Sequence, residues 1–144
     1  MGYTTKRLTG SQIEFRHIDY IGQAGVRLSE MYPNDYEWWR VDVVDLANKG
    51  YFAVCERDGE IVGFMIASFY SSTFDPTTTI LQQNLLYATP RTRAAHYLLK
   101  AFIDFGRKDF NHIITMIAPR TNIKPQSLKR LGFKELETLY GMET

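Results

Sequence analysis

The segment that decides the fold spans residues 81–110, LQQNLLYATPRTRAAHYLLKAFIDFGRKDF. Its second half carries small and apolar residues at the spacing of one helix face, namely Ala95, Leu98, Leu99, Phe102 and Gly106. The mostly apolar run 80–88 is typical of a strand, and Pro90 ends it because proline has no N–H group to donate to a sheet ladder. The segment therefore predicts a strand, a short basic loop and a helix whose apolar stripe faces the core.

The loop between this strand and this helix carries Arg91, Thr92 and Arg93. Free backbone N–H groups and the helix dipole favour an anion at a helix N-terminus, and guanidinium groups suit phosphate. The loop is therefore a candidate phosphate-binding cradle. The alternative interpretation is that the two arginines are solvated surface charges.

Composition limits the class of protein. The 144 residues are enough for one domain with a core of its own, and a net charge of +1 is not the basic balance of a nucleic-acid-binding protein. No apolar run approaches the roughly 18 residues of a membrane span, and the first residues lack the apolar segment of a secretory signal. With Cys55 as the single cysteine, we expect a cytoplasmic protein without nucleic-acid or membrane partners.

The start of the chain leaves alternatives open. Residues 3–8 and 13–18 could each supply a first strand, and Ser11-Gln12-Ile13-Glu14 matches a capping box, which would start a helix instead. We favour a strand over 13–18, with Asp19 capping a helix that ends at residue 31. The helical stripe on which this prediction depends consists of Ile21, Ala24, Gly25, Leu28 and Met31.

The rest of the chain alternates apolar runs with turn signals. The runs 51–56 and 60–70 are joined by Arg57-Asp58-Gly59, which predicts a hairpin. A strand over 112–118 follows the long helix and is expected to pair in parallel with 80–88 through a crossover. The other predicted elements are a helix over 36–48 ended by Gly50, a short helix over 125–131 ended by Gly132, and a last strand over 133–140.

Three short motifs, in this order, resemble the GCN5-related N-acetyltransferase (GNAT) family. They are Glu56-Arg57-Asp58-Gly59-Glu60-Ile61-Val62-Gly63, Ala88-Thr89-Pro90-Arg91-Thr92-Arg93 and Lys129-Arg130-Leu131-Gly132-Phe133. The resemblance extends over nearly the whole chain. It implies a single α+β domain over residues 1–144, with a mixed, mostly antiparallel central sheet, a parallel strand splay and flanking helices.

The resemblance also implies acetyl-CoA as cosubstrate. The pantetheine arm would pair with Leu86, Tyr87 and Ala88, and backbone amides of the loop and first helical turn would hold the pyrophosphate. The residues implied in holding the pyrophosphate are Arg91, Thr92, Arg93, Ala94, Ala95 and His96, with Asn122 as a further CoA contact. Where the family favours glycine, Ala94 is expected to narrow the cradle and His96 to obstruct it, unless His96 and the arginines bind phosphate through their side chains.

The catalytic positions implied by the resemblance depart from the family pattern. Asn84 stands where the family often has a glutamate, and Leu128, with Ser127 beside it, stands where the family often has a tyrosine. Tyr87 is either a core residue or a residue that faces substrate. The candidate catalytic residues are therefore Asn84, Tyr87 and Ser127, with a backbone amide near Tyr87 or Ala88 stabilising the oxyanion.

Other reactive side chains have plain structural interpretations. Cys55 is expected to be a small buried hydrophobe rather than a nucleophile. The three histidines have no ligand-like spacing, so no metal site is predicted. The family builds its acceptor pocket where this chain has an aromatic and acidic set, which suits a cationic amine or a protein surface. That set is Tyr32, Asp35, Tyr36, Glu37, Trp38 and Trp39.

Two classes of function follow from the sequence. The first is an N-acetyltransferase that acts on an amine of a small molecule or a protein. The second is a GNAT-like binding or assembly module without chemistry, resembling divergent acetyltransferase-like proteins of bacteriophages and bacteria. A homodimer is compatible with either class.

Overall fold

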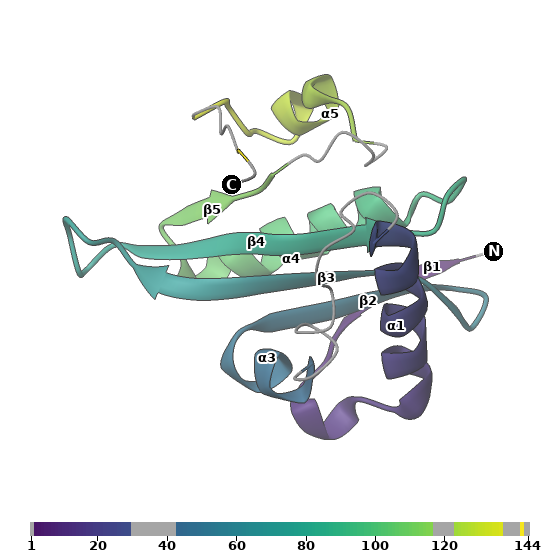
Figure 1. The fold of residues 1–144 in the computed structure, drawn as a ribbon. Helices are drawn as coiled ribbons and strands as arrows, with labels where there is room; N and C mark the ends of the chain where they lie inside the picture. Colours follow the sequence, from purple (N-terminus) through teal and green to yellow (C-terminus); the bar gives the residue numbers. More distant parts are fainter. Residues whose placement is uncertain (1, 30–42, 117–122, 137–141, 143–144) are drawn as a thin grey trace.

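The computed structural model describes residues 2–29, 43–116, 123–136 and 142. In this part of the chain, five strands form one sheet in the order β1-β2-β3-β4-β5, as Figure 1 shows. The first four strands are antiparallel neighbours, and β5 runs parallel to β4. The strands are β1 (Tyr3–Arg7), β2 (Tyr51–Arg57), β3 (Glu60–Ser71), β4 (Thr79–Ala88) and β5 (His112–Ile114). The α+β fold class and the parallel crossover are confirmed.

Helices cover both faces of this sheet (Figure 1). One face packs against α4 (Ala94–Asp109), whose whole predicted stripe is buried together with Met65 and Leu81 of the sheet. The other face packs against α1 (Phe15–Ser29) and α3 (Val43–Lys49), where Ile21 and Phe64 belong to a second core cluster. The strands between the two layers are buried on both sides, which explains their nearly continuous apolar runs.

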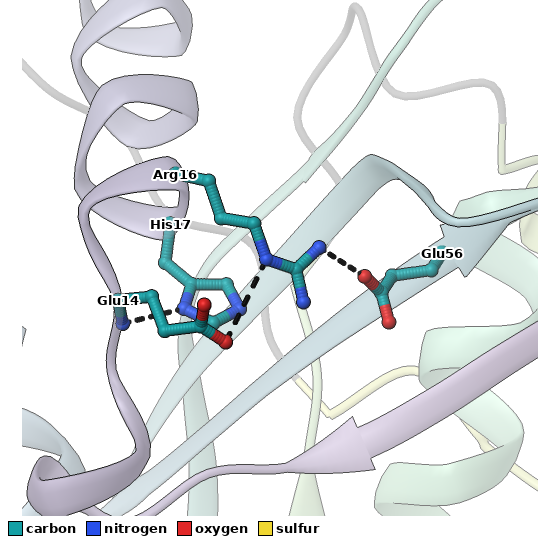
Figure 2. A network of polar contacts seen from close by, with 4 residues as sticks. All are labelled: Glu14, Arg16, His17 and Glu56. Atoms are coloured by element: carbon teal, nitrogen blue, oxygen red, sulfur yellow. Dashed lines mark hydrogen bonds and ion pairs between the residues drawn. The ribbon is translucent and has the colours of Figure 1, made fainter.

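The predicted strand over 13–18 is wrong, and the other stretch supplies the first strand. Tyr3–Arg7 forms β1 and pairs with β2, while α1 begins at Phe15. A local cap supports this helix start, because the backbone N–H of Glu14 donates to Nδ1 of His17 at 2.9 Å (Figure 2). His17, Ile21 and Ala24 are then buried at helical spacing, whereas Phe15 is 81% exposed.

A capping box does occur near the place that the sequence predicted. It begins at Thr9 rather than Ser11, because Oε1 of Gln12 accepts the Thr9 N–H at 2.8 Å. This contact opens the short 3-10 helix η1 (Gly10–Gln12), which precedes α1.

An ion pair ties the start of α1 to the sheet. The Arg16 guanidinium bonds to the Glu56 carboxylate of β2, and Glu14 lies 3.7 Å from Nε of the same arginine (Figure 2). Glu56 is only 7% exposed and lies at a register shift of β2. A buried carboxylate without a partner is strongly destabilising, so this pair helps to hold the start of α1 beside Glu56.

The C-terminal part differs from the prediction in two places. The strand expected over 112–118 is confirmed only for β5, since residues 115 and 116 are not in a strand and 117–118 lie outside the described residues. After α5 (Pro125–Arg130), residues 133–136 are not in a strand, and 137–140 lie outside the described part. The N–H of Phe133 instead donates to Leu128 at 3.0 Å across Gly132, whose φ is 100°, which is a Schellman-type helix end.

Two more predictions fall partly on undescribed positions. The second helix was expected over 36–48, and α3 is described only from Val43. The end of α1 likewise cannot be followed beyond Ser29. Both predicted hairpin strands and the strand over 80–88 are confirmed as β2, β3 and β4.

Candidate functional site

The central feature of the site is the point at which β4 and β5 separate. The two strands pair only from Ile80 opposite His112 to Gln82 opposite Ile114. At the next position Gln83 is 4% exposed, and its Oε1 accepts hydrogen bonds from the Thr115 hydroxyl and, at 3.4 Å, from the Met116 N–H. Where β4 and β5 diverge, the Gln83 side chain therefore takes the place of the backbone hydrogen bonds that join the two strands up to Gln82.

Beyond Gln83, the β5-facing edge of β4 has no strand partner in the described part of the chain. On its other edge β4 stays paired with β3 as far as Ala88. The backbone groups of residues 84–88 on the open edge are thus positioned to bond an extended ligand lying in the splay.

Asn84 lies at a β-bulge beside the splay. Gln83 pairs with Ala67 and Leu85 pairs with Ile66, so Asn84 is the extra residue of β4. The bulge also changes which side chains of β4 point to which face of the sheet. Leu81 and Leu86 both pack on the α4 side, although residues five positions apart in a regular strand would point to opposite faces. Asn84 is exposed at this kink, and bulges commonly re-aim side chains next to active sites.

The end of β4 divides its side chains between the two faces. Leu86 and Ala88 pack against the α4 side, whereas Tyr87 faces α1. The Tyr87 ring lies 6.0 Å from that of Tyr20 and 6.1 Å from that of Phe64. Tyr87 is therefore a half-buried member of the aromatic core, as one of the two sequence-based interpretations predicted.

The loop after β4 is held by three hydrogen bonds centred on Thr89. Its N–H donates to Val62 at 2.8 Å, its carbonyl accepts the Thr92 hydroxyl at 2.6 Å, and its hydroxyl lies 2.7 Å from that of Tyr20. Arg91 follows Pro90 with φ of 64°, an arrangement typical of a type II turn. The loop is thus a defined turn, and Tyr20 is a residue of this site that sequence reasoning missed.

The first turn of α4 has open backbone donors. No side chain caps this helix, and the N–H of its N-cap residue Arg93 donates to the Tyr3 hydroxyl at 3.1 Å. The next amides, of Ala94, Ala95 and His96, have no acceptor within the helix because of helical geometry. Arg91 and Arg93 are exposed, and neither forms an ion pair with a carboxylate in the described ranges. This surface favours an anion.

Ala94 does not narrow the cradle, contrary to the sequence-based expectation. Its side chain is fully buried where α4 crosses β3, and a Cβ added to Gly63 would lie 2.9 Å from the Ala94 Cβ. The methyl group therefore packs in the core against β3 and does not point into the cradle. His96 is exposed and lies edge-on to the Tyr97 ring. Desolvation, with Arg93 and Lys100 nearby, lowers the pKa of His96, so its ring is mostly neutral at pH 7.

The remaining predicted site residues either have no recorded contact with the splay or lie outside the described residues. Ser127 is half-buried on α5, and its hydroxyl bonds to none of the residues that the structure describes. Leu128 packs against the α4-side core. Asn122 and the aromatic and acidic set at 32–39 lie outside the described residues. Cys55 is fully buried, and burial raises the pKa of its thiol, which fits an inert core residue.

The described ranges contain neither a metal-binding cluster nor a membrane-spanning helix. No group of three or more histidine, cysteine, aspartate or glutamate side chains is placed to hold a metal ion there. Nor does any helix in those ranges combine the length and apolarity that crossing a membrane requires.

Comparison with known proteins gives structural matches only. No protein-family model and no curated sequence matches this chain. A probable acetyltransferase matches over 98% of this chain and 97% of its own, at 14% identity and a TM-score of 0.71. These neighbours are acetyltransferases of the GNAT type. This chain has the GNAT fold.

Two further GNAT structures show how broad this group is. The aminoglycoside N-acetyltransferase AAC(6')-Iy in complex with CoA matches at 15% identity and a TM-score of 0.65, covering 98% of both chains. A ribosomal-protein-alanine N-acetyltransferase from Brucella melitensis biovar Abortus 2308 matches at 14% identity and a TM-score of 0.65, covering 100% of both chains. Sequence identities this low establish the common GNAT fold and not a common substrate.

Proposed function

We propose that the protein is an acyl-CoA-dependent N-acetyltransferase. The observation that carries this proposal is the position of the splay, which opens directly onto the uncapped N-terminus of α4. An extended ligand that pairs with residues 84–88 would bring its anionic end to the amides of Ala94, Ala95 and His96. Acetyl-CoA has this shape, with a pantetheine arm that ends in a pyrophosphate.

Different residues of the site would bind different parts of acetyl-CoA. The open edge of Leu86, Tyr87 and Ala88 would hold the pantetheine amides. The dipole of α4 and the side chains of Arg91 and Arg93 would neutralise the pyrophosphate. Because Thr89 is tied by three hydrogen bonds, little of the loop's freedom remains to be lost on binding.

The reaction needs few proton carriers. A neutral amine attacks the thioester carbonyl carbon, the C–N bond forms, the C–S bond breaks, and the proton lost by the amine balances the proton gained by the CoA thiolate. A backbone N–H near Tyr87 or Ala88 would stabilise the oxyanion. Asn84 does not titrate, so at the bulge it would orient the amine or a water, and Ser127 is the candidate donor to the thiolate. Positioning then contributes more than acid–base catalysis.

The acceptor is proposed only as an amine. The similar structures include enzymes named for aminoglycosides and for an alanine of a ribosomal protein, so they span small molecules and proteins. A panel of acceptors should therefore contain both polyamino sugars and peptides with free N-termini.

A second candidate is a GNAT-like binding module that has lost catalysis. One observation favours it, since Asn84 and Leu128 stand where the resemblance implies a glutamate and a tyrosine, and Leu128 packs in the core. Such a module would keep the fold and the core around α4 without turnover.

Thermal unfolding with and without acetyl-CoA tests the first step. Ligand at about 100 times its Kd should add roughly 2.7 kcal/mol to the free energy of unfolding. Release of free thiol with the acceptor panel then measures transfer. Binding with transfer supports the enzyme, binding without transfer to any acceptor supports the module, and no binding at millimolar acetyl-CoA contradicts the enzyme.

A further inference from the structure

A second cationic cluster lies beside the N-terminus of α4, on the side of the β2–β3 hairpin. Arg57 ends β2 directly opposite Tyr3 of β1, so the two side chains lie on the same face of the sheet. The Tyr3 ring stacks on Tyr97 of α4 with 4.7 Å between centroids and 16° between planes. This stack brings Arg57 next to the first turn of α4, although Arg57 and Arg93 are 36 positions apart in the sequence.

The Tyr3 hydroxyl connects the two arginines. Its oxygen accepts the backbone N–H of Arg93 at 3.1 Å and lies 3.3 Å from Nη1 of Arg57. A phenol oxygen has two lone pairs, so these donors occupy both, and its own proton is left to be donated outward. The hydrogen bond from Arg93, and then that from Arg57, lower the pKa of Tyr3, which makes its O–H a better donor.

Both guanidinium groups keep donors available. Cζ of Arg57 lies 5.8 Å from the Tyr3 ring centroid, and Cζ of Arg93 lies 5.9 Å from that of Tyr97. An arginine supported by an aromatic ring is preorganised, and its remaining N–H groups can bind phosphate in a fork. Neither arginine forms an ion pair with any described carboxylate. Two exposed like charges beside a helix N-terminus therefore favour a multiply charged anion.

We propose that Tyr3 and Arg57, with the Arg93 side chain shared between the two phosphate groups, form a second phosphate site, which takes the ribose 3′-phosphate of CoA while the α4 amides take the pyrophosphate. This inference rests on the function proposed above. Two hydrogen bonds in series separate the Arg57 guanidinium from the Arg93 amide, a span comparable to that of the ribose that joins the two phosphate groups. Dephospho-CoA lacks only the 3′-phosphate, so the cluster selects CoA over dephospho-CoA.

Isothermal titration calorimetry with CoA and dephospho-CoA tests this site. The unmodified protein should bind CoA about tenfold more tightly, which corresponds to about 1.4 kcal/mol. Arg57→Gln should remove most of this preference by weakening CoA alone. Tyr3→Phe keeps the ring stack and removes the hydroxyl, so it should reduce the preference by a smaller factor. Arg107→Gln removes an equal charge near the other end of α4 and should change neither affinity.

The outcomes separate the two proposals. Equal affinities of the unmodified protein for CoA and dephospho-CoA, or equal losses of both in Arg57→Gln, overturn the second phosphate site and leave CoA binding intact. Failure of the unmodified protein to bind either ligand at millimolar concentration overturns the proposed function itself. Melting temperatures of the three variants should match that of the unmodified protein within a few degrees, because all three side chains are at the surface or half-buried.

Discussion

The two long helices of this protein begin in opposite ways. Before α1, His17 accepts the Glu14 N–H, and the Arg16 charge is neutralised by Glu56. At the start of α4, no side chain caps the helix, and Arg91 and Arg93 have no acidic partner among the described residues. One backbone N–H at each start has a side-chain acceptor, His17 for Glu14 and Tyr3 for Arg93, so the difference lies in the charge, which is paired at α1 and unpaired with any described carboxylate at α4. The difference in charge is the feature on which the proposed anion site at α4 depends.

The largest expected effect concerns the packing of α4 against the sheet, which should be tight although the N-terminus of this helix is open. Leu98→Ala should lower the free energy of unfolding by about 2–5 kcal/mol, because Leu98 is fully buried under α4 and its loss leaves a cavity. Urea unfolding measures this change, with exposed Lys100→Ala as control at about 0.5 kcal/mol or less. A loss under about 1 kcal/mol at Leu98 would contradict the packing of α4 described above.

The next prediction concerns the positive charge at the N-terminus of α4. Changing Arg91 and Arg93 together to Ala should weaken acetyl-CoA binding at least about tenfold, since two charge-assisted contacts to the pyrophosphate are lost. The melting temperature should change little because exposed arginines contribute little to folding. The matched control is Arg107→Ala with Lys108→Ala in the last turn of α4. Equal affinity losses in both double variants, measured by calorimetry, would show a general charge effect and no cradle.

Breaking the cap of α1 should cost less. His17→Ala removes the acceptor of the Glu14 N–H and should lower the free energy of unfolding by about 1 kcal/mol from the cap alone. His17→Gln can restore the acceptor and should recover part of that loss. Neither change should alter acetyl-CoA affinity by more than about twofold, because α1 and α4 begin on opposite faces of the sheet. If Gln is no better than Ala in chemical denaturation, the cap does not contribute.

The same histidine should make folding stability depend on pH. Desolvation, and then Arg16, lower the pKa of His17 below its ordinary value of 6.5, so the unfolded chain binds the proton more readily than the folded protein. This contribution to stability is therefore present above pH 6.5 and is lost as the pH falls from 6.5 to the lower folded pKa. Denaturant unfolding at several pH values should show a shallower loss in His17→Gln. Parallel curves for both proteins would exclude His17 as the titrating group.

The smallest effect concerns Ala94. Because its methyl group lies in the core against Gly63, Ala94→Gly should leave acetyl-CoA affinity unchanged while costing about 0.5–1 kcal/mol of stability in the helix. A clear gain in affinity without a loss of stability would mean that the side chain does face the cradle after all. Calorimetry and thermal unfolding of the one variant measure both quantities.

Local patterns were sufficient for most elements of the fold. The apolar stripe of α4, the Asp58-Gly59 turn and Pro90 each act through nearby backbone geometry, so periodicity and turn chemistry predict them correctly. The first strand was predicted incorrectly because the local pattern allowed either of two stretches, 3–8 and 13–18, to form it. The choice between them depends on the pairing of Tyr3 with Arg57 and on the ion pair of Arg16 with Glu56, and both are long-range contacts.

The candidate site was predictable only in part. The sequence identified the loop 89–93 and the strand before it, because basic residues and proline mark a strand-to-helix turn. It could not show that Asn84 is a bulged residue, that Tyr20 bonds Thr89 or that Gln83 bridges the splay, since each depends on the register of another strand or on a distant helix. The expectation that the Ala94 side chain narrows the cradle was wrong for the same reason, since its contact with Gly63 lies on another strand.

The sequence by itself determined the order and type of most helices and strands and the presence of two arginines at the start of the long helix. Only the tertiary structure decided which helix end stays open, where the splay begins and which distant residues surround the cradle. The physical reason is that propensity and periodicity act over a few residues, whereas packing joins positions far apart. The Tyr3 hydroxyl accepts the backbone N–H of Arg93 because sheet pairing and the stack on Tyr97 bring together residues that are 90 positions apart.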